Sequence, residues 1–258
     1  MSKRKKLSPG ASLYNLSGRQ EIEFKVSGLP IFGSLNFPKN LKAGEQVPCV
    51  IDVHGWKGSR KGKKKFMLGV ELMKAGWAYF RFDLPGHNFS DGNIQKVSLG
   101  LFSRAIQKAM TALAKHPNID PNRFALIGTS VGGSAAIMTA ARDSRVKALV
   151  LWAPRSDYHD TAPNLYYVVD RSIVNHRIRR SGLRYDFYKA IGKFNGPVLI
   201  IHGQNDQFVN YTQSERLHQA VRSKKLFISP HVNHTFNGAE EAVVQITAEW
   251  FIKESGLG

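Results

Sequence analysis

A serine with a glycine two positions away on each side lies near the middle of the chain. Gly128 and Gly132 flank Ser130 in the sequence Gly-Thr-Ser-Val-Gly, which follows a short apolar run. A serine on a sharp turn from a strand to a helix needs such glycines, because side chains there would collide within the turn. The first amides of the helix would also favour negative charge near the serine oxygen. Ser130 is therefore the candidate nucleophile, although a serine that only caps the helix would fit the same five residues.

A serine hydroxyl needs a base to take its proton, and the base needs an acidic group to hold it. Asp206 and His234 each follow a predicted strand and come after Ser130 in the chain. Loops at the carboxyl ends of parallel strands meet at one edge of a sheet, so we expect the three side chains to converge. Asp206 could instead cap the next helix, and Asp157 and Asp160 are the rival acids. The rival histidines are His54, His87, His202 and His231.

An attacked carbonyl develops negative charge, which two backbone N–H groups can stabilise as an oxyanion hole. Val131 follows the candidate nucleophile directly, so its amide is the first expected donor. The turn His54-Gly55-Trp56 follows a buried strand, and we assign the second donor to the Trp56 amide. Gly55 would let the backbone come close to the serine, and the Trp56 indole could form a wall of the acyl pocket. The alternative for Trp56 is simple packing.

No cofactor or metal is expected. His231 and His234 are close in sequence, but no cysteine or carboxylate spacing completes a metal site around them. The lysine-rich run 57–65 lacks the spacing of a phosphate-binding loop. It is either a solvated helix start or a cationic rim that attracts anionic substrates together with Arg177, Arg179 and Arg180.

Composition limits the class of protein. The chain has 258 residues, a formal net charge of +18 and one cysteine, Cys49, which suits a reducing compartment. No apolar stretch approaches the ~20 residues of a membrane helix, and the basic N-terminus lacks the apolar run of a secretory signal. We therefore expect a cytoplasmic protein. The charge does not exclude nucleic acid, but without an RNA-binding motif we do not expect it as the partner.

Apolar patterning predicts strands alternating with helices in a single α/β domain over 19–258, after a flexible basic arm over 1–18. The segment at about 154–194 breaks this rhythm and is predicted to be a helical insertion or lid. The expected strands are 21–26, 31–37, 47–53, 77–82, the run before Gly128, 146–153, 197–201 and 225–229, with the first two forming an antiparallel pair at a sheet edge. One expected helix begins in the lysine-rich run and carries apolar residues between 66 and 73. The other expected helices span 97–116, follow Ser130 to about 141, and span 211–221 and 238–253.

The chain resembles the α/β-hydrolase superfamily over nearly its whole length. The resemblance rests on His54-Gly-Trp, the loop 83–90, Gly128-Thr-Ser-Val-Gly-Gly, His202-Gly-Gln-Asn-Asp and Asn233-His-Thr-Phe. Within the superfamily it is similar to small serine esterases such as cinnamoyl and feruloyl esterases and to their monoacylglycerol-lipase and acyl-peptidase relatives. The resemblance implies a mostly parallel eight-stranded sheet, a lid after the sixth strand, and hydrolysis without a cofactor. It also implies that Ser130, Asp206 and His234 form a catalytic triad.

These features favour a serine hydrolase that cleaves carboxylic esters of small or aromatic acids. A thioesterase or an aminopeptidase or acyl-peptidase would use the same three residues. A different class, a catalytically silent protein that binds anionic partners, is the second hypothesis. Asn88 stands where relatives usually carry glycine, and asparagine tolerates that left-handed turn. The insertion is rich in tyrosine and arginine, which argues against long-chain lipids as substrates.

Overall fold

The computed structural model describes residues 18–42, 44–159, 176–222 and 224–257. The expected basic arm therefore lies outside the described residues except for Gly18. The middle of the expected insertion, residues 160–175, also lies outside them. The ends of that insertion, including two helices, are described.

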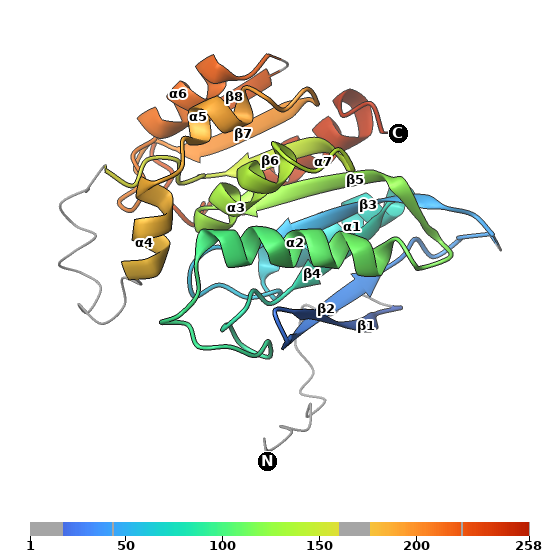
Figure 1. The fold of residues 1–258 in the computed structure, drawn as a ribbon. Helices are drawn as coiled ribbons and strands as arrows, with labels where there is room; N and C mark the ends of the chain where they lie inside the picture. The colour runs from blue at the N-terminus through green and yellow to red at the C-terminus, as the bar shows by residue number, and fades with distance from the viewer. Residues whose placement is uncertain (1–17, 43, 160–175, 223, 258) are drawn as a thin grey trace.

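Eight strands form one sheet in the order β1-β2-β4-β3-β5-β6-β7-β8 (Figure 1). Strands β3 to β8 run parallel to their neighbours, whereas β1 pairs antiparallel with β2, and β2 with β4. The expected edge pair and the mostly parallel sheet are both confirmed. The strands are β1 (Gln20–Val26), β2 (Leu29–Asn36), β3 (Val47–Val53), β4 (Ala78–Phe82), β5 (Ile119–Thr129), β6 (Val146–Trp152), β7 (Val198–Gly203) and β8 (Lys224–Ser229).

Helices cover both faces of the sheet. Figure 1 shows α2 and α3 on the near face and α1 and α7 behind the sheet. The continuous apolar runs of the central strands follow from this arrangement, because parallel strands covered on both sides bury every side chain. All seven residues of β3 are buried. The helices are α1 (Lys63–Lys74), α2 (Leu99–Leu113), α3 (Val131–Ala140), α4 (His176–Leu183), α5 (Phe187–Ile191), α6 (Thr212–Ala220) and α7 (Glu240–Glu254).

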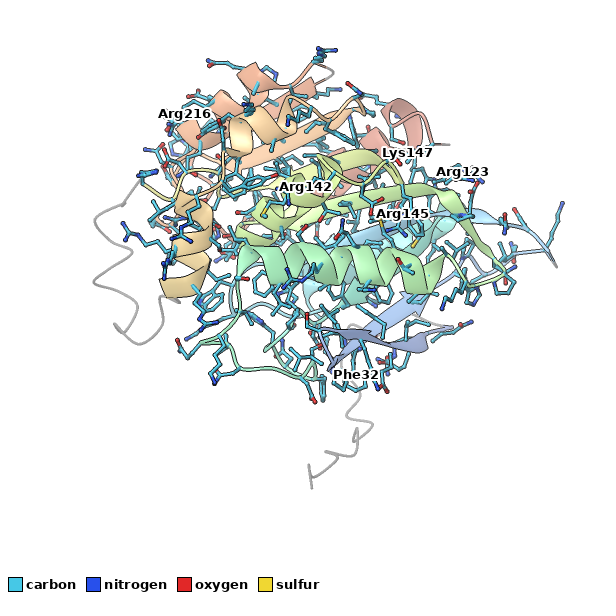
Figure 2. All side chains as sticks on the ribbon, viewed as in Figure 1. Phe32, Arg123, Arg142, Arg145, Lys147 and Arg216 are labelled. Atoms are coloured by element: carbon cyan, nitrogen blue, oxygen red, sulfur yellow. The ribbon has the colours of Figure 1, made fainter. Side chains whose placement is uncertain are left out.

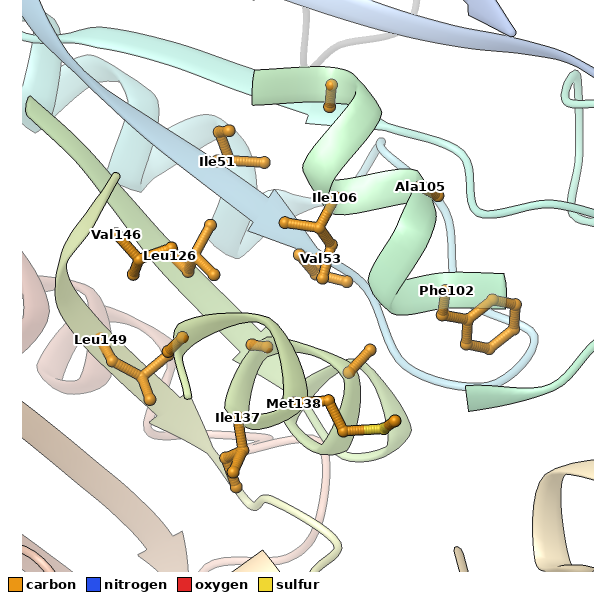
Figure 3. Packing of buried hydrophobic residues seen from close by; sticks show 14 of the residues in the cluster. Ile51, Val53, Phe102, Ala105, Ile106, Leu126, Ile137, Met138, Val146 and Leu149 are labelled. Carbon is orange, nitrogen blue, oxygen red and sulfur yellow. The ribbon is translucent and has the colours of Figure 1, made fainter. Parts of the chain in front are cut away.

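The core between the sheet and the near helices fixes the strand ends that carry the site. Ile106 of α2 points toward Val53 of β3 (Figure 3), and Phe102 of α2 and Leu126 of β5 belong to the same buried cluster. Each of these side chains is fully buried, and burying one such side chain is worth about 1.5–3 kcal/mol. The apolar stripe of α2 at helical spacing therefore holds β3 and β5, the strands that lead into the Trp56 turn and into Ser130.

Strand β5 is longer than the apolar run before Gly128 suggests. It begins at Ile119, which pairs with Val47 of β3, and the pairing between the two strands shifts register between Val47 and Cys49. The polar residues 120–123 at its start are not fully buried. Hydrophobic patterning locates only the buried half of a strand, so the polar extension gave no signal.

After β6, helices α4 and α5 pack back onto the near face. Ser181 Oγ of α4 accepts a hydrogen bond of 3.2 Å from the backbone N–H of Leu99, the first residue of α2. Gly182 lies against the ring of Tyr158, where a Cβ atom would come within 2.2 Å of a ring carbon. Among the described helices, none is both long and apolar enough to cross a membrane.

Candidate active site

Ser130 lies at the sharp turn between β5 and α3, which we call the elbow. Its backbone conformation is one that residues other than glycine rarely adopt. Its φ is 53° and its ψ is −119°. The strain is held by the Ser130 N–H, which donates to the Trp152 carbonyl oxygen at 3.0 Å, and by the Arg155 N–H, which donates to the Ser130 carbonyl oxygen at 3.1 Å. The side chain makes no capping hydrogen bond to α3, all of which is described. The geometry therefore disfavours the reading of Ser130 as only a helix cap.

Three glycines make this turn sterically possible. A Cβ atom on Gly128 would lie 2.6 Å from the Cα atom of Gly133, and one on Gly132 would lie 2.4 Å from the carbonyl oxygens of both Val53 and His54. Gly55 lies on the other side of the serine, with its own hypothetical Cβ 3.2 Å from Ser130 Cβ and 3.9 Å from its Oγ. The backbone of the Trp56 turn thus lies directly against the candidate nucleophile.

Asp206 and His234 are joined, although they lie 28 residues apart in the chain. His234 Nδ1 lies 2.5 Å from Asp206 Oδ2, and the other carboxylate oxygen accepts the backbone N–H groups of Phe208 and Val209, each at 2.8 Å. Burial of the carboxylate acts to raise the pKa of Asp206. Hydrogen bonds from His202 and His234 outweigh this effect and hold the pKa below its usual range. Asp206 is therefore ionised at neutral pH.

His234 belongs to the loop after β8, residues 231–237, which we call the histidine loop. With Nδ1 donating to Asp206, the neutral ring keeps a lone pair on Nε2, as a general base must. Phe208 packs edge-on against the ring, with centroids 5.4 Å apart. Ser130 and His234 lie on loops at the same edge of the sheet, because β5 and β8 are both parallel members of it.

His202, considered above only as a rival base, touches the opposite side of the acid. Its Nε2 lies 3.0 Å from Asp206 Oδ2 and 3.1 Å from the Val209 carbonyl oxygen. Both neighbours are acceptors, so Nε2 carries the proton, and Nδ1 accepts from the Ser214 hydroxyl at 2.6 Å. The signal that could have found this role is its position: a histidine at the end of β7, four residues before the acid.

None of the remaining described rivals is placed as Asp206 and His234 are. Asp157 Oδ2 pairs with Arg216 at 3.2 Å, whereas Asp160 lies outside the described residues. His231 is exposed and has a φ of 60°. Asp206 does not take the capping role either, because the residue preceding α6 in the cap position is Tyr211.

His54 orients the turn that carries the expected second oxyanion donor. Its Nδ1 donates to the Gly55 carbonyl oxygen at 2.7 Å, and its Nε2 accepts the Leu84 N–H at 2.9 Å. Burial, reinforced by the neighbouring His87, holds the pKa of His54 well below its usual value, so the ring is neutral. The Gly58 N–H also donates to the Gly55 carbonyl oxygen. Because a trans peptide points its N–H away from its C=O, these two bonds fix the direction of the Trp56 amide.

Val131 is the first residue of α3, and the first amides of a helix have no acceptor within the helix. Its N–H is therefore suited to an oxyanion. The Trp56 indole is half-buried and packs edge-on against His87, with ring centroids 5.4 Å apart. The Trp56 side chain can serve in packing while the Trp56 backbone N–H serves as the oxyanion donor, so the two interpretations do not exclude each other.

The run 57–65 divides into two sets. Three of its cations make specific contacts: Arg60 with Glu21 and Asp83, Lys65 with Asp52, and Lys64 with the carbonyl oxygen of Thr235. The other cations, Lys57, Lys61 and Lys63, are exposed, and Lys61 Nζ lies 5.7 Å from the ring centroid of Phe89. The run is therefore neither a uniform solvated helix start nor a uniform rim.

Three of the cations labelled in Figure 2 bind to neighbouring groups of the protein itself. Arg123 pairs with Asp120 at 2.7 Å, Arg145 pairs with Asp143 at 2.7 Å, and Lys147 donates to the Ser144 carbonyl oxygen at 2.8 Å. These neighbouring carboxylates and carbonyls reduce the positive potential that a phosphate backbone would meet.

The described part of the chain contains neither a cluster of metal ligands nor an accessible thiol. No group of three or more histidine, cysteine, aspartate or glutamate side chains there could hold a metal ion. Cys49 is buried in β3, and burial raises the pKa of its thiol, which disfavours the reactive thiolate.

Comparisons with known proteins agree with this architecture. The profile of the prolyl oligopeptidase family matches residues 85–257, more than half of the chain. An uncharacterized protein of Mycobacterium tuberculosis is 28% identical over 229 residues, covering 88% of this chain and 75% of its own. The mitochondrial palmitoyl-protein thioesterase ABHD10 of Rattus norvegicus is 24% identical, covering 83% of this chain and 74% of its own.

Among solved structures, Est1E from Butyrivibrio proteoclasticus with ferulic acid bound is similar in fold. Its TM-score is 0.77 at 22% identity, covering 90% of this chain and 98% of Est1E. The expected α/β-hydrolase fold is thus confirmed by the sheet order and by this likeness.

Proposed function

Because the chain belongs to the prolyl oligopeptidase family and is a hydrolase of the α/β-hydrolase fold, we propose that it is a serine hydrolase cleaving carboxylic esters of small or aromatic acids. One observation carries the proposal. An ionised, buried Asp206 holds His234 through Nδ1 at the sheet edge where Ser130 lies on a strained elbow. This is the arrangement that gives a serine hydroxyl a base with a fixed tautomer.

Acylation would begin when His234 Nε2 takes the proton of Ser130 as its oxygen attacks the ester carbonyl. The imidazolium that forms is stabilised by Asp206, whose Oδ2 already accepts the Nδ1 proton. Collapse of the tetrahedral intermediate would return the proton to the leaving alcohol and leave an acyl-serine. Water activated by the same histidine would then release the acid.

The negative charge of each tetrahedral intermediate would be bound by the amides of Trp56 and Val131. The support is the glycine-lined approach of the Trp56 turn to Ser130 and the orientation of its peptide by His54. Such a pre-oriented donor needs no reorganisation during the reaction, and one donor is worth about 3–4 kcal/mol of transition-state stabilisation.

The acyl group is the least constrained part of the proposal. An aromatic acid is favoured by the exposed Phe208 edge beside His234 and by the ferulic acid bound to Est1E. Thioester hydrolysis is the second candidate, favoured by the similarity to a palmitoyl-protein thioesterase. Peptide hydrolysis is the third, because the family is named for it.

Anionic esters are proposed as preferred substrates within this class. The support is the pair of exposed cations Lys57 and Lys61, close in sequence to the Trp56 turn. At low ionic strength, kcat/KM for an anionic ester should exceed that for its neutral analogue, and salt should remove the difference. Equal values at low salt would contradict this preference.

We also propose a cytoplasmic location, supported by the single, free and buried cysteine.

A panel of substrates tests the proposal. It would contain p-nitrophenyl and aryl esters of increasing acyl length, one thioester and one aminoacyl amide. We expect the short and aromatic esters to have the highest kcat/KM, and Ser130→Ala to abolish turnover. Preference for the thioester or the amide would redirect the assignment within serine hydrolases, whereas turnover that survives Ser130→Ala would overturn it.

A further inference from the structure

Lys64 reaches from α1 to the histidine loop. Its Nζ donates a hydrogen bond of 2.5 Å to the carbonyl oxygen of Thr235, the residue after His234. The same Nζ lies 4.7 Å from the ring centroid of Phe236. An ammonium group at this distance from an aromatic ring is attracted to its face. Lys64 therefore contacts the two residues that follow the candidate base.

The same amine also lies near the strand end that supports the nucleophile. Lys64 Nζ is 5.6 Å from the ring centroid of Trp152, the last residue of β6. The carbonyl oxygen of Trp152 accepts the N–H of Ser130 at 3.0 Å. The Trp152 ring is itself fixed, because its Nε1 donates to Thr247 Oγ1 at 3.0 Å and its face meets the edge of Phe236. Lys64 thus lies between Trp152, which binds the backbone of Ser130, and the histidine loop, which carries His234.

The Asn233 side chain makes several of the hydrogen bonds within the histidine loop. Asn233 Oδ1 accepts the backbone N–H groups of Thr235 and Asn237, each at 3.1 Å. The loop is therefore a compact unit, and contacts with the rest of the protein decide where that unit lies. Phe236 is fully buried with a φ of 59°, a strained conformation that neighbouring groups must maintain.

We propose that Lys64 is a positioning residue, which holds the histidine loop through Thr235 and Phe236 so that His234 faces Ser130, and which does so best when its amine is charged. A charged donor makes the stronger hydrogen bond, and the attraction to an aromatic face requires the charge. The inference rests on the proposed function, because positioning matters only if His234 is the base.

The surroundings of Lys64 bring its titration into a measurable range. Burial lowers the pKa of Lys64 from 10.5 to about 8, and Lys65 adds to this effect. The carboxylates that face it oppose the shift: Glu240 at the start of α7 and Asp52 of β3. Below about pH 8 the amine is charged and the tether is complete. Above it the amine becomes neutral and loses its attraction to Phe236.

The test measures kcat/KM against pH for a neutral alkyl ester in a pH-stat, so that neither substrate charge nor leaving-group ionisation contributes. The variants are Lys64→Arg, which keeps the charge, and Lys64→Met, which removes it. Lys63→Met is the matched control, because Lys63 is adjacent on α1 but exposed. Labelling of the wild type by a fluorophosphonate, with Ser130→Ala as its control, is run in the same series.

We expect the wild type and Lys63→Met to lose activity as pH rises through about 8. Lys64→Arg should hold its activity to at least about one pH unit higher, because a guanidinium stays charged. Lys64→Met should be roughly tenfold slower near neutral pH, with no fall near pH 8, since one charge-assisted contact is worth about a factor of ten. The Lys64→Met result can be interpreted only if that variant folds. The pH profile of Lys64→Arg tests the proposal even if Lys64→Met does not fold.

An unchanged alkaline fall in Lys64→Arg, or wild-type kcat/KM in Lys64→Met, would overturn the inference while leaving the proposed function intact. A wild type that is not labelled at Ser130 would overturn the proposed function and the inference with it. A wild type without a fall near pH 8, or a fall near pH 8 that persists in Lys64→Met, would place the titrating group elsewhere and would also overturn the inference.

Discussion

The elbow and the histidine loop hold the proposed nucleophile and the proposed base by opposite means. Ser130 is placed by its immediate neighbours, because Gly128 and Gly132 leave only backbone where the strand turns into α3. His234 is placed by residues far away in the chain: Asp206 holds its ring, and Lys64, 170 positions before it, holds the carbonyl of the next residue. One site thus combines a local steric solution with a long-range polar one.

The two halves are therefore sensitive to different substitutions. A side chain added at Gly128 or Gly132 would collide with backbone atoms, and this collision would affect folding as well as catalysis. A polar tether fails when one partner or one charge is removed, and the fold can survive that loss.

Asp206→Asn should give the largest loss. An amide cannot accept from His234 Nδ1 and both backbone N–H groups as the carboxylate does, so the ring loses its tautomer and its counter-charge. We expect kcat/KM to fall by about 10⁴-fold at neutral pH. Asp157→Asn is the matched control, because that carboxylate pairs with Arg216 instead. If Asp157→Asn gives the larger loss, the acid has been misassigned.

Gly132→Ala should break the local half. Its new Cβ would lie 2.4 Å from two carbonyl oxygens, and backbone atoms cannot move aside cheaply. We expect the free energy of unfolding to fall by about 1–3 kcal/mol or more, together with loss of hydrolase activity. Gly100→Ala in α2 meets no atom closer than 3.8 Å and should instead stabilise the protein by up to about 1 kcal/mol. Chemical denaturation of both variants would test the contrast, which fails if Gly132→Ala is as stable as the wild type.

His202→Asn should weaken the polar half without destroying it. Asp206 would keep its two backbone donors and His234 but lose the second imidazole, so the carboxylate is held less firmly. We expect kcat/KM to fall roughly tenfold, and Ser214→Ala, which removes only the support of His202, to fall less. His231→Asn, at an exposed histidine, is the control. Full activity in His202→Asn would mean that the backbone donors alone position the acid.

The smallest expected effect is a slope in the pH dependence of stability. Burial lowers the pKa of His54 and of His87 in the folded protein, so below the unfolded value of 6.5 the unfolded chain binds more protons. Acidification from about pH 7 to 5 should therefore lower the free energy of unfolding, by up to about 1.4 kcal/mol per pH unit for each histidine. His54→Gln should flatten this slope. A slope identical to that of the wild type would indicate that His54 takes up its proton in the folded state.

Much of the fold could be predicted from the sequence, because central strands such as 47–53 are continuous apolar runs and α2 has an unbroken helical stripe. The order Ser130, Asp206, His234 along the chain also identified loops that end at one sheet edge. The polar start of β5 was missed because it carries no apolar pattern. Partners that depend on distant contacts, such as His202 and Lys64, could not be assigned from type and spacing, since other histidines and lysines looked equivalent.

The most direct measurement of the central claim is mass-spectrometric mapping of a fluorophosphonate adduct on the wild type and on His234→Ala. We expect a single adduct on Ser130 of the wild type, and labelling slowed by orders of magnitude in His234→Ala. An adduct on another residue, or labelling of Ser130 at the same rate without the imidazole, would contradict it.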